Sequence, residues 1–268
     1  MKFVSERIDH VKIANGYCVI CGNFGKLKKD HVPPQCASKP SPMLQKTISE
    51  YFSNTRVPPI KAKSGTTFRT ICHNCNSNIL GSMDAEIGRV TTEFIEKLND
   101  YFSGKFFYKN YISLKFDADK FLRAMIGHLL AATSVKDCMK PIVDSPFYTP
   151  LRNFVLGRNP DIGATHNIYY WFYPFRKQIT AQSVTFYNNG HHSICSCLHF
   201  FPISFLVTLK EQGTFPIHAT EMTQYDQSLH FNMTTANIDY ASFPFVGLKN
   251  NQFMMVISGP VSYTHLRA

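Results

Sequence analysis

The sequence lacks any apolar run that approaches the roughly 20 residues a membrane-spanning helix needs. Residues 1–11 mix charged and apolar side chains and do not resemble a secretory signal. Acidic residues are few, because 18 Asp and Glu stand against 28 Lys and Arg. Core-forming side chains are not scarce, however, since 44% of the residues are apolar and 14% aromatic, which excludes a disordered chain. We expect a folded, soluble, cytoplasmic protein.

The positive charge is concentrated near the beginning of the chain. Residues 1–80 contain twelve Lys and Arg against four Asp and Glu, whereas the remaining 188 residues contain sixteen against fourteen. Such an excess predicts a polyanionic partner, and nucleic acid is the first candidate. A solvated basic surface is the alternative. The lysines that precede Asp30-His31 favour the nucleic acid.

Two C-x-x-C pairs frame this basic region, Cys18 with Cys21 and Cys72 with Cys75. Four thiolates at this spacing are typical of a structural zinc site. Gly22 supports this interpretation, since a chain that turns tightly around an ion needs a residue that tolerates positive φ. Buried thiols and disulfides are the alternatives, and the absence of a secretory signal argues against disulfides.

Asp30 and His31 lie between the two pairs and suggest hydrolytic chemistry. A hard divalent cation such as Mg²⁺ takes carboxylate oxygen as a ligand, and a neutral imidazole accepts a proton from an attacking water. Asn76 follows Cys75 directly, so zinc would fix its position as a second magnesium ligand. Asp-His dipeptides are common, and only the position between two zinc knuckles gives this one weight.

The order Cys18-x-x-Cys21, residues 30–34 (DHVPP) and residues 72–76 (CHNCN) resembles the HNH endonuclease superfamily, the ββα-metal nucleases. The zinc-bound branch, which includes phage Holliday-junction resolving endonucleases, has this same order. The resemblance covers residues 17–102. Residues 66–71 contain no middle asparagine of the kind many members carry, and Asn54 is the nearest candidate upstream.

The resemblance implies roles for individual residues. It implies a structural zinc ion on Cys18, Cys21, Cys72 and Cys75. It implies Mg²⁺ or a similar ion on Asp30 and Asn76, with His31 as the general base. We expect nucleic acid to contact Lys26, Lys28, Lys29, Arg69 and His73. His73 has a zinc-ligand role as its alternative.

We expect an α+β fold with a nuclease module in residues 1–103. The pattern predicts a short helix within 1–16, two strands within 17–32 joined by a turn at 23–25, a short helix around 43–52, and a helix from Ser77 or Ser82 to Phe102. Asp84 and Glu86 either add an acidic group at the metal or favour the N-terminus of that last helix.

Residues 104–260 are expected to form an α+β accessory domain that is mostly β. A helix is predicted over 116–135, with Asp117 or Asp119 near its start and His128 as a core or interface residue. Strands are predicted over 168–175, 183–187, 203–209 and 253–258.

Two further patterns in this part leave alternatives open. His191, His192, Cys195 and Cys197 suggest either a second metal site or a strand that follows a hairpin turn at 188–190. The aromatic residues of 169–175 with Arg176 and Lys177 either stack on bases or belong to the core. Residues 261–268 resemble translated sequencing-adapter read-through, and we expect a non-native tail there.

The sequence thus favours a metal-dependent DNA endonuclease of the HNH class, with a role in phage defence or in a mobile element as a hypothesis. The alternative is a non-catalytic zinc module that binds nucleic acid. A third hypothesis is a nuclease that the accessory domain controls through a ligand, a regulatory partner or homodimerisation.

Overall fold

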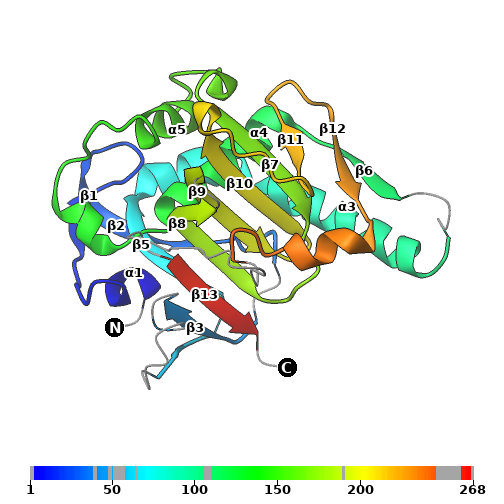
Figure 1. Ribbon diagram of the computed structural model, residues 1–268. Coiled ribbons are helices and arrows are strands. Elements are labelled where there is room, and N and C mark those ends of the chain that lie inside the picture. Colours follow the sequence, from blue (N-terminus) through cyan, green and yellow to red (C-terminus); the bar gives the residue numbers. More distant parts are fainter. Residues whose placement is uncertain are drawn as a thin grey trace.

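A computed structural model describes residues 3–38, 41–47, 50, 58–63, 65–105, 110–188, 191–245 and 261–266, the last six and residues 187–188 by their backbone alone. The described residues contain both helices and antiparallel strands, consistent with an α+β fold (Figure 1). The helices are α1 (Val4–Arg7), the π-helical η1 (Asn74–Leu80), α3 (Asp84–Phe102), α4 (Ala118–Ala131) and α5 (Tyr148–Val155). The 3-10 turns are η2 (Val135–Met139), η3 (Ile162–Ala164), η4 (Lys210–Gln212) and η5 (Thr235–Tyr240).

The basic N-terminal region forms a small antiparallel sheet with the order β1-β2-β5. Its strands are β1 (Asn15–Tyr17), β2 (Phe24–His31) and β5 (Thr67–Cys72). Gly22, with φ of +78°, closes the turn between β1 and β2, as the knuckle interpretation predicted. The helical segments η1 and α3 follow β5 directly, so the chain runs from the strands into a long helix.

An eight-stranded sheet crosses the middle of the molecule in the order β11-β7-β10-β9-β8-β13-β3-β4 (Figure 1). Its strands are β3 (Met43–Thr47), β4 (Ile60–Ala62), β7 (His166–Phe172), β8 (Gln178–Asn188), β9 (His191–Phe200), β10 (Ile203–Leu209), β11 (Thr220–Met222) and β13 (Val261–Leu266). β13 pairs with β8 on one side and β3 on the other, so residues 261–266 join the two parts of the sheet. A separate pair is formed by β6 (Tyr111–Lys115) and β12 (Ser228–Asn232).

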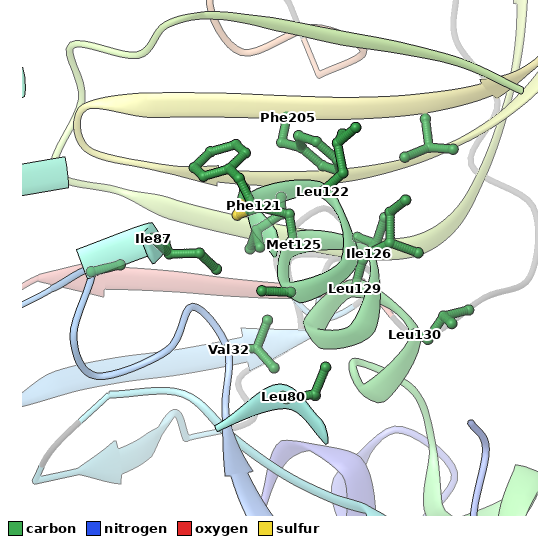
Figure 2. Packing of buried hydrophobic residues seen from close by; sticks show 14 of the residues in the cluster. Val32, Leu80, Ile87, Phe121, Leu122, Met125, Ile126, Leu129, Leu130 and Phe205 are labelled. Atoms are coloured by element: carbon green, nitrogen blue, oxygen red, sulfur yellow. The ribbon is translucent and has the colours of Figure 1, made fainter. Parts of the chain in front are cut away.

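Helix α4 lies between the large sheet and the N-terminal region. Its Phe121 and Leu122 point toward Phe205 of β10, while Val32 and Leu80 lie on its opposite side (Figure 2). All five side chains belong to one buried hydrophobic cluster. The core therefore joins residues of the cysteine-containing region to residues of the second part.

The contact between α4 and η1 is close because residue 127 is a glycine. A Cβ at Gly127 would lie 2.2 Å from Cδ2 of the buried Leu80, a separation that two non-bonded carbon atoms do not adopt. The missing side chain lets α4 approach the end of η1. The next residue along α4, His128, is thereby brought to the N-terminal region.

The opposite face of the large sheet carries a second buried cluster, built from aromatic and small residues of β7–β10. Tyr169, Trp171 and Tyr173 point to this face from alternate positions of β7 and its extension. Of the aromatic residues in 169–175, those of 169–173 are therefore core, the second of the two alternatives, whereas Phe175 is 38% exposed. Ala241 covers part of this face and accepts a hydrogen bond from Trp171 Nε1.

Several expected elements agree with the structure and others do not. The turn predicted at 23–25 is wrong, because residues 24 and 25 belong to β2 and pair with β1 at 15–17, so the chain turns within 18–23. Asp117 caps α4 by accepting a hydrogen bond from the Lys120 amide. Asn188 of β8 pairs with His191 of β9, as in the predicted hairpin. The predicted helix around 43–52 is wrong for residues 43–47, which form β3 because Met43, Gln45 and Thr47 alternate into the interior. The strand predicted at 253–258 lies outside the described residues. Among those described, no helix combines the length and apolar content that crossing a membrane requires.

Candidate metal centre and adjoining polar site

The four predicted cysteines lie together. One sulfur from each of Cys18, Cys21, Cys72 and Cys75 falls within 4.8 Å of all the others, and Cys21 Sγ is 3.7 Å from Cys72 Sγ. Sulfurs at the corners of a zinc tetrahedron with bonds of about 2.3 Å are about 3.8 Å apart. The cluster could therefore hold a metal ion such as zinc.

The thiol protons support the same conclusion. Hydrogen bonds with Cys18 and Cys75 lower the pKa of Cys21 to about 3, while contacts with Cys18 and Cys21 raise the pKa of Cys75. The Cys21 thiolate is thus stabilised at the expense of Cys75. Only a cation among the sulfurs allows all four to be deprotonated together.

The first knuckle is held from two directions. The Val19 amide donates to the Thr70 carbonyl of β5, and Arg152 Nε of α5 donates to the Val19 carbonyl at 3.0 Å. Arg152 also donates to the Val143 carbonyl. A side chain from the second part therefore supports the loop between Cys18 and Cys21.

Asp30 points into the protein because the ladder between β2 and β5 is irregular. Its register shifts between Lys28 and Asp30. The buried positions of β2 are Leu27 and Asp30, three residues apart, where regular alternation would give two. Asp30 is consequently only 3% exposed.

The partner of Asp30 is His128. Its Nδ1 lies 3.0 Å from Asp30 Oδ2, and its Nε2 lies 2.8 Å from Asp84 Oδ1 in the first turn of α3. Burial alone would lower the pKa of His128, but the two carboxylates outweigh it and raise the pKa to about 10. An imidazolium ion thus bridges two carboxylates.

His31, the next residue after Asp30, is half-buried. Its Nε2 lies 3.1 Å from Nε2 of Gln35, and since the amide nitrogen can only donate, the ring nitrogen accepts. Burial and the charge of Lys29 lower the pKa of His31, although Asp30 acts in the opposite direction. The imidazole is therefore neutral, with one nitrogen available as an acceptor.

Asn76 is brought to the same strand. Its Nδ2 donates to the Lys29 carbonyl at 2.9 Å, which orients the amide and leaves Oδ1 as the acceptor atom. Because Lys29 precedes Asp30 in β2, the start of η1 is fastened beside the Asp30-His31 pair. Asn76 thus lies beside the last residues of β2, the strand that carries Asp30 and His31.

The expected nucleic-acid contacts divide into two groups. Lys26 and Lys29 are exposed on β2 and Lys28 is half-buried, while the exposed His73 pairs with the Ser77 hydroxyl. Arg69 is directed elsewhere, because its guanidinium lies over the Phe3 ring at 4.3 Å and 4.0 Å from the Glu6 carboxylate.

Of the two acidic residues at the start of α3, Asp84 contacts His128, as described above. Glu86 is bound by Arg89 and accepts from the Asp117 amide at the start of α4. Glu86 therefore links α3 to α4.

The other proposed metal group, His191 to Cys197, is not assembled. Cys195 and Cys197 are buried in the aromatic cluster of the large sheet. Among the described residues, the four-cysteine group is the only one with three or more His, Cys, Asp or Glu side chains close enough to share an ion.

Sequence reasoning placed His128 in the core or at an interface and did not connect it with Asp30. A lone histidine within the apolar stripe of a helix is the available signal, since a buried imidazole needs a polar partner. Nothing in the sequence says which of the acidic residues is that partner. Comparisons with protein-family models, with curated proteins and with solved structures find no match for this chain.

Proposed function

We propose that the protein is a metal-dependent endonuclease of the ββα-metal type, which hydrolyses phosphodiester bonds of DNA. The observation that carries the proposal is that Asn76, directly after Cys75 of the four-cysteine cluster, is hydrogen-bonded to the backbone of β2 at the residue before Asp30 and His31. A carboxylate, a neutral imidazole and an oriented amide are the groups that hydrolysis of a phosphodiester needs.

The donor atoms fit Mg²⁺. One oxygen of Asp30 is bonded to His128, and among the described residues no group is hydrogen-bonded to the other, nor to Asn76 Oδ1. A carboxylate oxygen and an amide oxygen suffice, since Mg²⁺ retains several waters and binds substrate phosphate. Asp30 and Asn76 would hold the ion, which supplies Lewis acidity at the phosphate when bound.

The remaining steps belong to the protein's own side chains. His31 accepts the proton of the attacking water at Nε2, the atom that now accepts from Gln35, so Gln35 gives way to the water. The exposed Lys26 and Lys29 hold the phosphate backbone of the substrate. The four cysteines with zinc fix the positions of β2 and η1 and take no part in the chemistry.

A plasmid cleavage assay tests the proposal. With Mg²⁺, the wild type is expected to nick or linearise supercoiled plasmid, and His31→Ala is expected to lower the rate by about 10²-fold or more, the usual contribution of a general base. Asp30→Asn is expected to lower it similarly. His230→Ala, an exposed histidine of β12 outside this region, serves as the control for purification. Equal cleavage by all variants would identify a contaminant and refute the proposal.

A specific observation also favours the competing function, a zinc module that binds nucleic acid without cleaving it. Asp30 is 3% exposed and ion-paired, as a purely structural carboxylate would be. DNA binding by a zinc-loaded wild type that leaves linear, branched and single-stranded substrates intact with Mg²⁺ or Mn²⁺ would establish that function instead.

A further inference from the structure

His128 stands out as a buried charged residue that joins parts of the chain far apart in sequence. It is 1% exposed, and its two ring nitrogens contact Asp30 of β2 and Asp84 of α3. Asp30 and Asp84 are 98 and 44 residues away along the chain, respectively. One imidazole from α4 therefore connects the strand of the candidate site to the helix that follows it.

The contact geometry determines which atoms of Asp30 are used. Each ring nitrogen of His128 faces one carboxylate oxygen, Nδ1 at 3.0 Å from Asp30 Oδ2 and Nε2 at 2.8 Å from Asp84 Oδ1. The contact from Nδ1 occupies Oδ2 of Asp30 and fixes the carboxylate plane. The oxygen that remains is Oδ1, the one free to face an ion.

Stability alone does not account for this arrangement. A buried ion pair gains little over well-packed apolar residues of similar volume, because removing charges from water is costly. The neighbours of His128 on α4 are apolar, and Leu129, Ile126 and Met125 are all buried. An apolar residue at position 128 would suit the core but would leave Asp30 buried without a partner.

The backbone of α4 is also adapted to the contact. Gly127 permits the close approach to Leu80, and Thr70 of β5 donates its hydroxyl hydrogen to the Ala131 carbonyl near the end of the same helix. These contacts lie before and after His128 on α4. The imidazole is therefore held at a fixed depth relative to β2.

We propose that His128 is a positioning residue for the candidate magnesium site: it holds Asp30 Oδ2 so that Oδ1 is presented to the ion, and Asp84 anchors its far side. This inference rests on the proposed function and deepens it. It means that the second part of the chain, through α4, completes the site of the N-terminal region.

Two substitutions separate the two contacts of His128. The amide nitrogen of asparagine reaches about as far as Nδ1, and that of glutamine about as far as Nε2. His128→Asn therefore retains a donor to Asp30 and loses the one to Asp84, while His128→Gln does the reverse. Asp119→Asn, an exposed carboxylate on the same helix, is the matched control.

The readout is Mn²⁺ binding to zinc-loaded protein, followed by electron paramagnetic resonance and calorimetry, with zinc content and melting temperature measured in parallel. Loss of such a ligand-orienting contact typically weakens metal affinity about 10–100-fold, and we expect this of His128→Gln. His128→Asn is expected to remain within about threefold of wild type, as is the control. Cleavage rates should follow the same order at subsaturating metal.

Several outcomes would overturn the inference. Equal Mn²⁺ affinity in both variants, or an equal loss in both, would make His128 a structural residue only. Tighter binding by His128→Gln would show that His128 competes with the ion for Asp30. If His128→Gln does not fold, Asp84→Asn is measured instead, because this carboxylate is 26% exposed. Unchanged Mn²⁺ affinity in Asp84→Asn would refute the role of Asp84 in holding His128.

The failure of the proposed function would look different. A zinc-loaded wild type that neither binds Mn²⁺ nor cleaves plasmid contradicts the nuclease proposal itself. A wild type that does both, with variants that behave identically, contradicts only the role of His128.

Discussion

The two sides of the large sheet treat the same kinds of residue in opposite ways. On the side of α4 and the knuckle region, His128 contacts two carboxylates and four cysteines gather around one point. On the other side, His199 stacks on Tyr173, and among the described residues no carboxylate bonds to its ring. Cys195 and Cys197 are likewise buried among apolar side chains there.

The pKa values express this difference. Burial lowers the pKa of His199 to about 3, because no carboxylate opposes it, whereas carboxylates raise the pKa of His128 to about 10. Burial raises the pKa of Cys195 well above its usual value, so that residue is an inert thiol. The chemical role of a histidine or cysteine in this protein is therefore set by the partners that the fold supplies and not by its residue type.

The largest expected effect tests the cysteines. Cys75→Ser should lose zinc and cost more than about 5 kcal/mol, because zinc supplies about 10–16 kcal/mol of folding free energy in small zinc peptides. Cys195→Ala, a buried cysteine on the other face, should keep zinc and cost about 1 kcal/mol. Zinc content and chemical denaturation are measured for both variants. Equal losses of zinc and stability in Cys75→Ser and Cys195→Ala would contradict the difference between the two groups of cysteines.

The second prediction concerns acid stability. Burial lowers the pKa of His166 and of His218 to about 4 and of His199 to about 3, so each is neutral when folded but takes up a proton near pH 6.5 when unfolded. Stability should therefore fall as pH drops below 6.5, by up to about 1.4 kcal/mol per pH unit for each histidine.

His199→Phe isolates one of these protons. The ring size is kept and two unpaired polar atoms are removed, so the variant should gain about 1 kcal/mol at pH 7 and lose one histidine's share of the acid sensitivity. Urea denaturation at pH 7, 6 and 5 measures both quantities. Parallel pH profiles for the variant and the wild type would contradict the assignment of His199 as a neutral buried base.

The third prediction tests whether the second part supports the knuckle. Arg152→Met removes the bond to the Val19 carbonyl and should lower the free energy of unfolding by about 2 kcal/mol, the usual range for a charged hydrogen bond. It should also speed the release of zinc to a chelator. Lys136→Met, an exposed residue paired with Asp9, is the control and should change neither. If zinc release is unchanged in Arg152→Met, then α5 does not support the loop between Cys18 and Cys21.

The smallest expected effect concerns single phosphate contacts. Lys29→Gln should reduce the slope of log affinity against log salt by about 0.9, the value for one lost phosphate contact on duplex DNA. Arg69→Gln should leave the slope unchanged, because its guanidinium already lies against Phe3 and Glu6. Fluorescence anisotropy at several salt concentrations measures both, and the reverse result would place the DNA on α1 instead of β2.

The sequence was informative where the signal is local. The spacing of Cys18 and Cys21 and of Cys72 and Cys75 predicted a cluster that the structure assembles, since a knuckle is formed by a few consecutive residues. The apolar stripe, with Asp117 or Asp119 near its start, predicted α4 for the same reason, and the structure shows Asp117 as the cap. The helix predicted at 43–47 failed because pairing with β4, which lies outside that segment, decides its conformation.

By itself, then, the sequence predicted two cysteine pairs that could bind a metal ion, the basic character of their surroundings and several of the helices and strands, because each of these signals lies in a few neighbouring residues. Only the tertiary structure decided which histidine is charged and which is neutral. That choice depends on whether a carboxylate lies within hydrogen-bonding distance of a buried ring, and for His128 the carboxylate of Asp30 comes from 98 residues away.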